Sequence, residues 1–160
     1  MRIGIGFTGS PYTISDKIRY AKMAEDKGLD SVWIAEDHYL RDAVSTLAAL
    51  AASTNRIKLA TSIINPYTRN PALIAMTMAT LDEFSNGRMI LGLGAADKAH
   101  IEQMGIEYKD PVRMIRETVE VVRALLSGEK VVYEGRIVKA QGIQIGVVPF
   151  FESFGFGGFK

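Results

Sequence analysis

Short apolar runs alternate along the chain with longer segments in which apolar residues recur at helical spacing. The runs at residues 2–7, 31–35, 57–63 and 89–93 predict four strands, and a predicted helix follows each of the first three. The strands begin about 30 residues apart, which is the length of a βαβ unit. This alternation is typical of an α/β fold with a parallel sheet covered by helices. The pattern leaves two architectures open, a doubly wound sheet and part of a βα-barrel.

The first helix has a recognisable start and end. Ser15 is its expected N-cap, because a serine hydroxyl can accept a hydrogen bond from the free backbone N–H groups of the first turn. The apolar spacing then places Ile18, Ala21 and Ala24 on one face. Gly28 suits the left-handed residue that ends a helix.

The rhythm changes after the fourth predicted strand. A short helix is expected over residues 98–104, and a hairpin over 131–139 precedes a further strand over 143–148. Between them, a long helix opens at Asp110 and Pro111, and its predicted apolar stripe consists of Val112, Ile115, Val119, Val122 and Leu126. We expect residues 1–148 to form one domain. The tail at 149–160 has no period and is rich in phenylalanine and glycine.

Composition excludes several classes of function. The net charge is +1, from 19 basic and 18 acidic residues, which gives no electrostatic footprint for nucleic acid or an anionic membrane. No apolar run reaches the length of a membrane span, and the N-terminus does not resemble a signal peptide, so a cytoplasmic location is expected. Cysteine is absent and there are 2 histidines, so neither disulfides nor a metal site is expected.

Polar residues gather where predicted strands end. Glu36-Asp37-His38 follows the second strand, and a carboxylate beside an imidazole can hold a proton near neutral pH. A polar surface loop would have the same composition. Gly92 and Gly94 end the fourth strand, where glycines let backbone approach a ligand. They match a dinucleotide fingerprint poorly, because the third glycine is missing and the strand is not the first.

Taken together, these segments resemble the luciferase-like superfamily, in particular its coenzyme F420-dependent branch and the methylenetetrahydromethanopterin reductases within it. The likeness covers residues 1–148 and is carried by the runs 57–71, 79–88 and 91–98. Asn-Pro-Tyr at 65–67 and Ser-Asn-Gly-Arg at 85–88 are its most specific motifs.

The resemblance implies a partial (β/α)8 TIM-type barrel, made of the first four βα units and a hairpin, with a ring cofactor at its C-terminal rim. The cofactor is expected to be F420, with FMN as the alternative. Asp37 and His38 match a motif near the redox-active ring and are the candidate catalytic residues. The implied cofactor-binding residues are Thr61, Ser62, Ile63, Asn65, Gly94 and Asp97. In this branch, the bond that matches Ser62-Ile63 is often a non-prolyl cis peptide.

Two residues depart from the reductase pattern. Gly6 stands where those enzymes usually have an acid near the end of the first strand, and Ala96 stands where their fourth-strand loop usually has a glycine. A complete barrel takes about 250 residues. The 160-residue sequence therefore resembles the N-terminal half of the family and stops before its strands five to eight.

The resemblance implies an oxidoreductase that transfers hydride between a deazaflavin and a small organic substrate, such as methylenetetrahydromethanopterin. Two alternatives stay open: a non-catalytic half-barrel that dimerises or binds flavin weakly, and an FMN-dependent monooxygenase. A half-barrel also exposes strand edges that a closed barrel would pair. We therefore expect a homodimer as well as a small-molecule partner.

Overall fold

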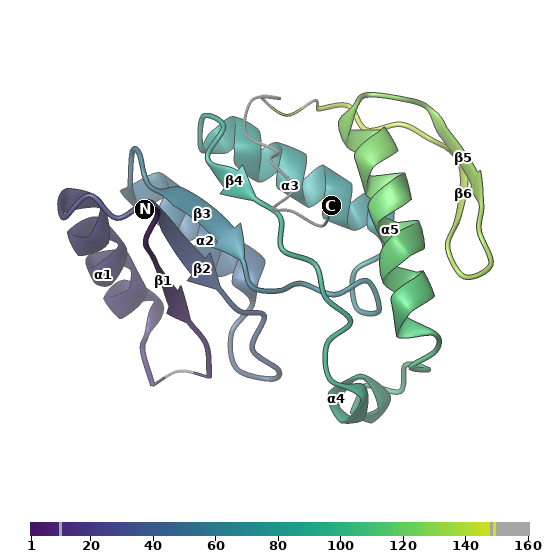
Figure 1. The fold of residues 1–160 in the computed structure, drawn as a ribbon, viewed down its shortest axis with the longest axis horizontal. Coiled ribbons are helices and arrows are strands. Elements are labelled where there is room, and N and C mark those ends of the chain that lie inside the picture. The colour runs from purple at the N-terminus through teal and green to yellow at the C-terminus, as the bar shows by residue number, and fades with distance from the viewer. Residues whose placement is uncertain (10, 148, 150–160) are drawn as a thin grey trace. The chain divides into compact units, whose positions relative to one another are not determined.

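The computed structural model describes residues 1–9, 11–147 and 149 (Figure 1). Apart from residue 149, the tail predicted at 149–160 lies outside the described residues. The described residues form two compact units, one of residues 1–63 with 81–92 and one of residues 64–80 with 93–149. The elements in chain order are β1 Gly4–Phe7, α1 Ile14–Asp26, β2 Ser31–Ile34, α2 Ala43–Ser53, β3 Lys58–Thr61, α3 Pro71–Phe84, β4 Met89–Ile90, α4 Lys98–Gln103, α5 Pro111–Leu126, β5 Val131–Glu134 and β6 Lys139–Ile143.

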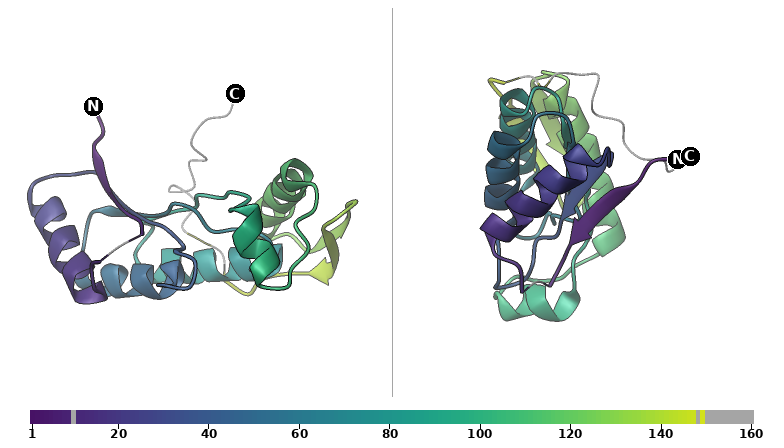
Figure 2. Two further views of the ribbon diagram at one scale, coloured as in Figure 1. Left: turned by 90° about the horizontal axis from the view of Figure 1, so that it is seen from below. Right: turned by 90° about the vertical axis from the view of Figure 1, so that its left-hand side faces the viewer.

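The first unit is built on a four-stranded parallel sheet. Gly4 pairs with Ser31, Ser31 with Lys58, and Leu59 with Met89, so the carboxyl ends of all four strands lie at one edge. Helices α1 and α2 lie on the same face of this sheet (Figure 2). The core consists of buried aliphatic side chains from strands and helices, among them Val32, Ile34, Leu47, Leu50 and Leu59.

The strand order decides between the two architectures that the pattern left open. The order is β1-β2-β3-β4, so each strand lies beside the one before it in sequence. A doubly wound sheet reverses its strand order and carries helices on both faces. A βα-barrel adds strands consecutively and keeps its helices outside. The sheet therefore follows the barrel pattern.

The prediction that Ser15 caps α1 was wrong. The N-cap is Thr13, whose hydroxyl accepts a hydrogen bond from the backbone N–H of Asp16 at 3.1 Å. The Asp16 carboxylate in turn accepts from the Thr13 N–H at 3.0 Å, which completes a capping box. Because two groups are satisfied at once, the helix begins before Ser15. Lys17, rather than Ile18, then takes a fully buried position.

The fourth strand is shorter than the predicted 89–93. It ends at Ile90. Beyond this point, the hydroxyl of Thr61 replaces the backbone hydrogen bonds between β3 and β4. This hydroxyl accepts from the N–H of Gly92 and donates to its carbonyl, both at 2.8 Å. A Cβ at Gly92 would lie 2.1 Å from the carbonyl oxygen of Thr61, so only glycine fits here.

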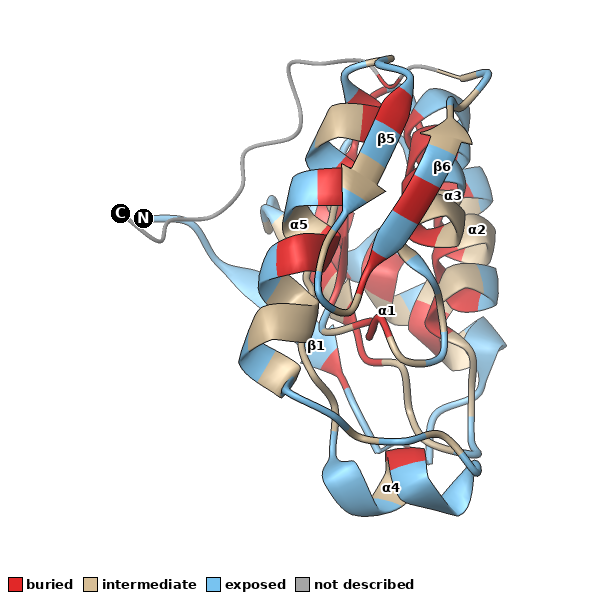
Figure 3. Ribbon diagram, turned by 90° about the vertical axis from the view of Figure 1, so that its right-hand side faces the viewer, coloured by how far each residue is buried: buried red, intermediate tan, exposed pale blue. Residues whose placement is uncertain are grey.

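The second unit contains the long helix α5 and the hairpin of β5 and β6 (Figure 3). The predicted stripe of α5 was partly wrong: Val122 and Leu126 are buried, but Val112 is 73% exposed. Glu117 and Thr118 are buried in its place, because the Glu117 carboxylate binds the turn of the hairpin.

The strand predicted over 143–148 is absent from the described part of that segment. The strand β6 instead ends at Ile143, and residues 144–147 have no strand pairing. Residue 148 lies outside the described residues. None of the helices in the described ranges is long and apolar enough to cross a membrane. The cytoplasmic location stays a prediction.

Candidate functional site

The carboxyl ends of β2 and β3 bring five of the predicted site residues to the same end of the sheet in the first unit. The Ser62 N–H donates to the Ile34 carbonyl at 2.7 Å, and the Glu36 N–H donates to the Ile63 carbonyl at 3.3 Å. These bonds hold the Ser62–Ile63 segment beside the segment that carries Asp37 and His38. The Ser62–Ile63 peptide bond is cis, as the resemblance implies. We call the segments 36–38 and 61–63 the rim.

The three polar residues after β2 have separate tasks. Glu36 accepts a hydrogen bond from the Ala43 N–H at 2.8 Å and so supports the start of α2. Asp37 reaches across to the loop between β1 and α1, where its Oδ1 accepts from the Gly9 N–H at 2.7 Å and from the Thr8 hydroxyl at 3.4 Å. His38 is half-buried, so it combines contact with the protein and access to solvent.

The second carboxylate oxygen of Asp37 is in an unusual state. Among the described residues, Oδ2 is buried and has no hydrogen-bond partner. An unpaired buried oxygen is costly, so its geometry suits a ligand that brings an N–H or O–H donor. Flavin and deazaflavin rings both carry an N–H group. The rim therefore fits such a ring, and the described residues contain no cluster of acidic, His or Cys side chains that could hold a metal ion.

Thr61 is already engaged within the protein. Its side chain is fully buried, and its hydroxyl makes both hydrogen bonds to Gly92. Ser62, the next residue, is exposed. Thr61 therefore joins β3 to the segment after β4. Ser62 and Ile63 are the rim residues of this segment whose side chains are not fully buried.

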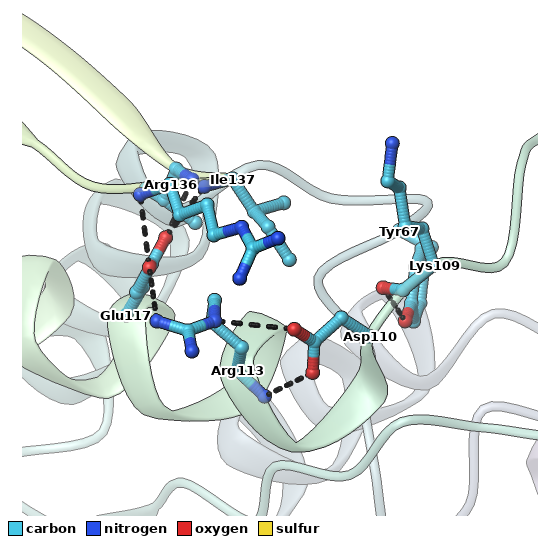
Figure 4. Close-up of polar contacts among 8 residues, drawn as sticks. Tyr67, Lys109, Asp110, Arg113, Glu117, Arg136 and Ile137 are labelled. Carbon is cyan, nitrogen blue, oxygen red and sulfur yellow. Dashed lines mark hydrogen bonds and ion pairs between the residues drawn. The ribbon is translucent and has the colours of Figure 1, made fainter.

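Asn65, which belongs to the second unit, organises the Asn-Pro-Tyr loop. The side chain is 2% exposed, and its Oδ1 accepts from the N–H groups of Tyr67 and Thr68 at 3.1 and 3.0 Å. The Tyr67 ring stacks on Tyr108 with 4.8 Å between centroids, and its hydroxyl donates to the Lys109 carbonyl at 2.9 Å (Figure 4). This motif fixes a loop whatever else it binds.

Gly94 and Asp97 also lie in the second unit. The Gly94 N–H donates to the Ile64 carbonyl at 3.1 Å. Asp97 is the N-cap of α4, and its Oδ1 lies 2.9 Å from Nδ1 of His100. The bond from the backbone N–H of His100 and the bond to its side chain lower the pKa of Asp97. Asp97 is exposed, so its capping role leaves it accessible.

Lys17 has a buried position that the hydrophobic pattern did not indicate. This lysine is 1% exposed on α1, in the same buried stripe as Ala21 and Ala24. Burial lowers the pKa of Lys17, the charge of Asp37 raises it, and the charge of Arg41 lowers it. Lys17 precedes Ala21 and Ala24 at helical spacing, and this spacing was the only sign in the sequence that it faces the core. The predicted apolar face included Ile18 instead of Lys17.

The Ser-Asn-Gly-Arg motif has a structural role. The Arg88 guanidinium donates to the Ala51 carbonyl at 2.9 Å, the Thr54 hydroxyl at 2.8 Å and the Ile57 carbonyl at 3.2 Å. It thereby joins the start of β4 to the end of α2. Gly87, in the turn between α3 and β4, has a positive φ of 74°.

Comparison with known proteins identifies the family to which the sequence is similar. The sequence matches the family described as luciferase-like monooxygenase over residues 2–149. It is 41% identical to the 5,10-methylenetetrahydromethanopterin reductase of Methanolobus tindarius, over 94% of this chain and 47% of that protein. It is 31% identical to the F420-dependent glucose-6-phosphate dehydrogenase of Amycolatopsis mediterranei, over 84% of this chain and 44% of that protein.

A solved structure supports the same assignment. The coenzyme F420-dependent tetrahydromethanopterin reductase of Methanopyrus kandleri superposes with a TM-score of 0.82 and 35% identity, over 92% of this chain and 46% of that chain. The chain therefore spans about half the length of the relatives it matches. The predicted partial (β/α)8 barrel is confirmed.

Proposed function

The chain belongs to the luciferase-like monooxygenase family, and we propose on that premise that it forms part of an F420-dependent oxidoreductase. The reaction is hydride transfer between the deazaflavin and a small organic substrate. When bound, the deazaflavin supplies the carbon that gives or accepts the hydride, and the protein supplies position and electrostatics. The relatives named for F420 support this choice of cofactor.

The observation that carries the proposal is the rim, where residues that match the family motifs lie at the ends of adjacent strands. Oδ2 of Asp37 is buried and has no hydrogen-bond partner among the described residues, so a ring N–H that reaches it would pair it. Ser62 and Ile63 lie beside it and form the surface against which a ring can rest. His38 can hold or move a proton near neutral pH.

Asn65, Gly94 and Asp97 are kept as cofactor-binding residues in this proposal, as is Thr61. For Thr61 and Asn65, the support is indirect, because their side chains hold the backbone of the neighbouring segments in place. The finer substrate class we propose is a methylenetetrahydromethanopterin-type carbon carrier. It is supported by the likeness to the two reductases.

A titration with F420 tests the cofactor. The absorbance and fluorescence of F420, followed as the chain is added, report its binding. We expect Asp37→Asn and His38→Ala to weaken F420 binding about tenfold or more, the loss of roughly one good hydrogen bond. Lys22→Met, at an exposed position of α1, should leave binding unchanged.

Two results would overturn the proposal. The first is tighter binding of FMN than of F420, which would favour the monooxygenase alternative. The second is failure of the wild-type chain to bind either cofactor, which would favour a non-catalytic half-barrel.

The homodimer is a further part of the proposal. Within the described residues, β1 and β4 each have only one neighbouring strand, so each keeps an open edge. A second copy can pair with both edges at once and supply the remaining side of the rim. Beside β1 there is also an apolar groove, lined by Ile5, Phe7, Tyr12, Tyr20, Met23 and Leu29, that a partner's side chains can fill.

A further inference from the structure

Two tyrosine rings stack in the second unit and join two of its loops. Tyr67 comes from the Asn-Pro-Tyr loop after β3, and Tyr108 comes from the segment between α4 and α5. Their ring centroids lie 4.8 Å apart with 23° between the ring planes, and both side chains are half-buried. Stacked aromatic rings at this distance attract each other beyond the area that they bury. The pair therefore fixes Tyr108 against the loop after β3.

Tyr67 is itself held on two sides. Its backbone N–H donates to Oδ1 of Asn65 at 3.1 Å, and the Asn65 side chain is buried. Its hydroxyl donates to the carbonyl of Lys109, the residue after Tyr108, at 2.9 Å (Figure 4). Tyr67 therefore contacts the 108–109 segment twice, by the face of its ring and by its hydroxyl, and it supports the position of Tyr108.

The Tyr108 hydroxyl contacts the loop after β4. It donates to the Ala96 carbonyl at 3.4 Å, a long hydrogen bond between residues that are 12 positions apart. Ala96 has a left-handed backbone with φ of 59°, which an L-residue adopts only at a cost. The next residue, Asp97, is the N-cap of α4, and its Oδ1 accepts from the backbone N–H of His100 at 3.2 Å.

The position of Ala96 determines where the Asp97 carboxylate lies. The loop is anchored before Ala96, where the Gly94 N–H donates to the Ile64 carbonyl at 3.1 Å, and after it, where Asp97 caps α4. If the left-handed alanine turned toward ordinary backbone angles, its carbonyl would turn with it and Asp97 would shift. The bond from the Tyr108 hydroxyl to that carbonyl opposes the turn.

We propose that Tyr108, supported by Tyr67, is a positioning residue that acts through Ala96 on Asp97. Its hydroxyl holds the left-handed peptide in place, and this peptide keeps the Asp97 carboxylate in the position from which it binds the cofactor. The role of Asp97 toward a deazaflavin rests on the proposed function. The action of Tyr108 on Asp97 does not, and it can be measured without any cofactor.

The first measurement follows hydrogen exchange of the His100 backbone amide by ¹H–¹⁵N NMR in the ligand-free chain. This amide donates to Asp97, so its protection reports the position of the carboxylate. Tyr108→Phe removes the hydroxyl and keeps the ring, and we expect His100 to exchange about threefold faster or more. Tyr133→Phe removes a hydroxyl that donates to Glu120 in the same unit, and it should leave this rate unchanged. An unchanged rate in Tyr108→Phe would overturn the proposal.

A rescue experiment separates positioning from a general loss of stability. Glycine adopts the left-handed conformation freely. Ala96→Gly, added to Tyr108→Phe, should therefore restore most of the lost protection of the His100 amide, whereas Ala99→Gly within α4 should not. No restoration by Ala96→Gly would overturn the action through Ala96.

A second variant covers the case in which Tyr108→Phe does not fold. Tyr67→Phe keeps the ring stack but removes the bond to the Lys109 carbonyl, so it loosens the support of Tyr108. We expect faster exchange of the His100 amide in this variant as well. An unchanged rate would overturn the proposal.

A titration with F420 then separates the two proposals. Weaker binding by Tyr108→Phe, with Tyr133→Phe unchanged, supports both. If the wild type binds no F420 but His100 still exchanges faster in Tyr108→Phe, the proposed function fails and the action of Tyr108 on Asp97 stands. If F420 binds and the His100 rate does not change, the proposed function stands and the action of Tyr108 is refuted.

Discussion

Ala96 has a left-handed backbone with φ of 59°, a conformation that costs an L-residue about 1–2 kcal/mol. The resemblance to the reductases implies a glycine at this position, and glycine adopts this conformation freely. We expect Ala96→Gly to raise the free energy of unfolding by about 0.5–1 kcal/mol, measured by urea denaturation. Ala99→Gly, within α4, should instead lower it by about 1 kcal/mol. Equal losses from both substitutions would contradict this explanation.

Glu117 anchors the hairpin turn to α5 (Figure 4). Its carboxylate accepts from the N–H groups of Arg136, Ile137 and Val138 at 3.0, 2.9 and 2.8 Å. Glutamine keeps the size of the side chain but loses the charge and one acceptor. We expect Glu117→Gln to destabilise the chain by about 2–3 kcal/mol in thermal or urea unfolding. Glu120→Gln is the control: Glu120 is exposed on the same helix and accepts one hydrogen bond, from the Tyr133 hydroxyl, which glutamine can still accept, so this change should cost much less.

The same carboxylate predicts a pH dependence. Burial raises the pKa of Glu117, but the three backbone N–H groups and the charge of Arg113 outweigh it, so the pKa lies below the ordinary value of 4.5. A lowered folded-state pKa gives stability that is complete above the ordinary value and is lost as pH falls through the folded value. The stability difference between wild type and Glu117→Gln should therefore shrink below about pH 4. A constant difference down to pH 2 would show that the charge contributes nothing.

Single residues also show how far the site could be predicted from sequence. Asp37 and His38 were predicted correctly to lie at the rim, because a polar cluster directly after an apolar strand is a local pattern. Lys17 was not found, because its burial depends on which face of α1 the capping box turns toward the sheet. The contact between Asp37 and Gly9 joins residues that are 28 positions apart, and no local pattern records it.

At the scale of elements, Arg88 connects the start of β4 to the end of α2. Its guanidinium satisfies two carbonyls and a hydroxyl near the end of α2, while it leads into β4. Methionine keeps the length of the side chain but leaves these buried acceptors unpaired. We expect Arg88→Met to cost about 3 kcal/mol or more of unfolding free energy. Arg116→Met, at an exposed position of α5, should change it by less than about 0.5 kcal/mol, and similar losses would refute the joining role.

The elements themselves follow from the sequence better than their limits do. Strands and helices of each βα unit were predicted because their hydrophobic period is local. Their ends were missed wherever a side chain replaces a backbone partner, as Thr13 does for α1 and Thr61 does for β4. The stripe of α5 failed for a related reason, since Glu117 is buried by the backbone it binds and not by its own hydrophobicity.

For the molecule as a whole, the sheet of the first unit has a consecutive parallel order and, within the described residues, two edge strands. An isolated sheet of this kind keeps unpaired backbone groups along β1 and β4, and the groove beside β1 keeps Met23 at 53% exposure. The sequence could indicate the barrel only through its family likeness, because barrel and open sheet share one local pattern. The strand order then separates them.

The open edges lead to a prediction about association. If a second copy covers the β1 edge and its groove, the 160-residue chain will sediment as a dimer that dissociates on dilution. Met23→Glu places an unpaired charge in the groove and should weaken the dimer about tenfold or more. Lys22→Glu alters the neighbouring exposed residue, which does not line the groove, and should have little effect. A wild-type monomer at every concentration in analytical ultracentrifugation would rule out the dimer. Equal weakening by both variants would show that general charge repulsion, and not the groove, controls association.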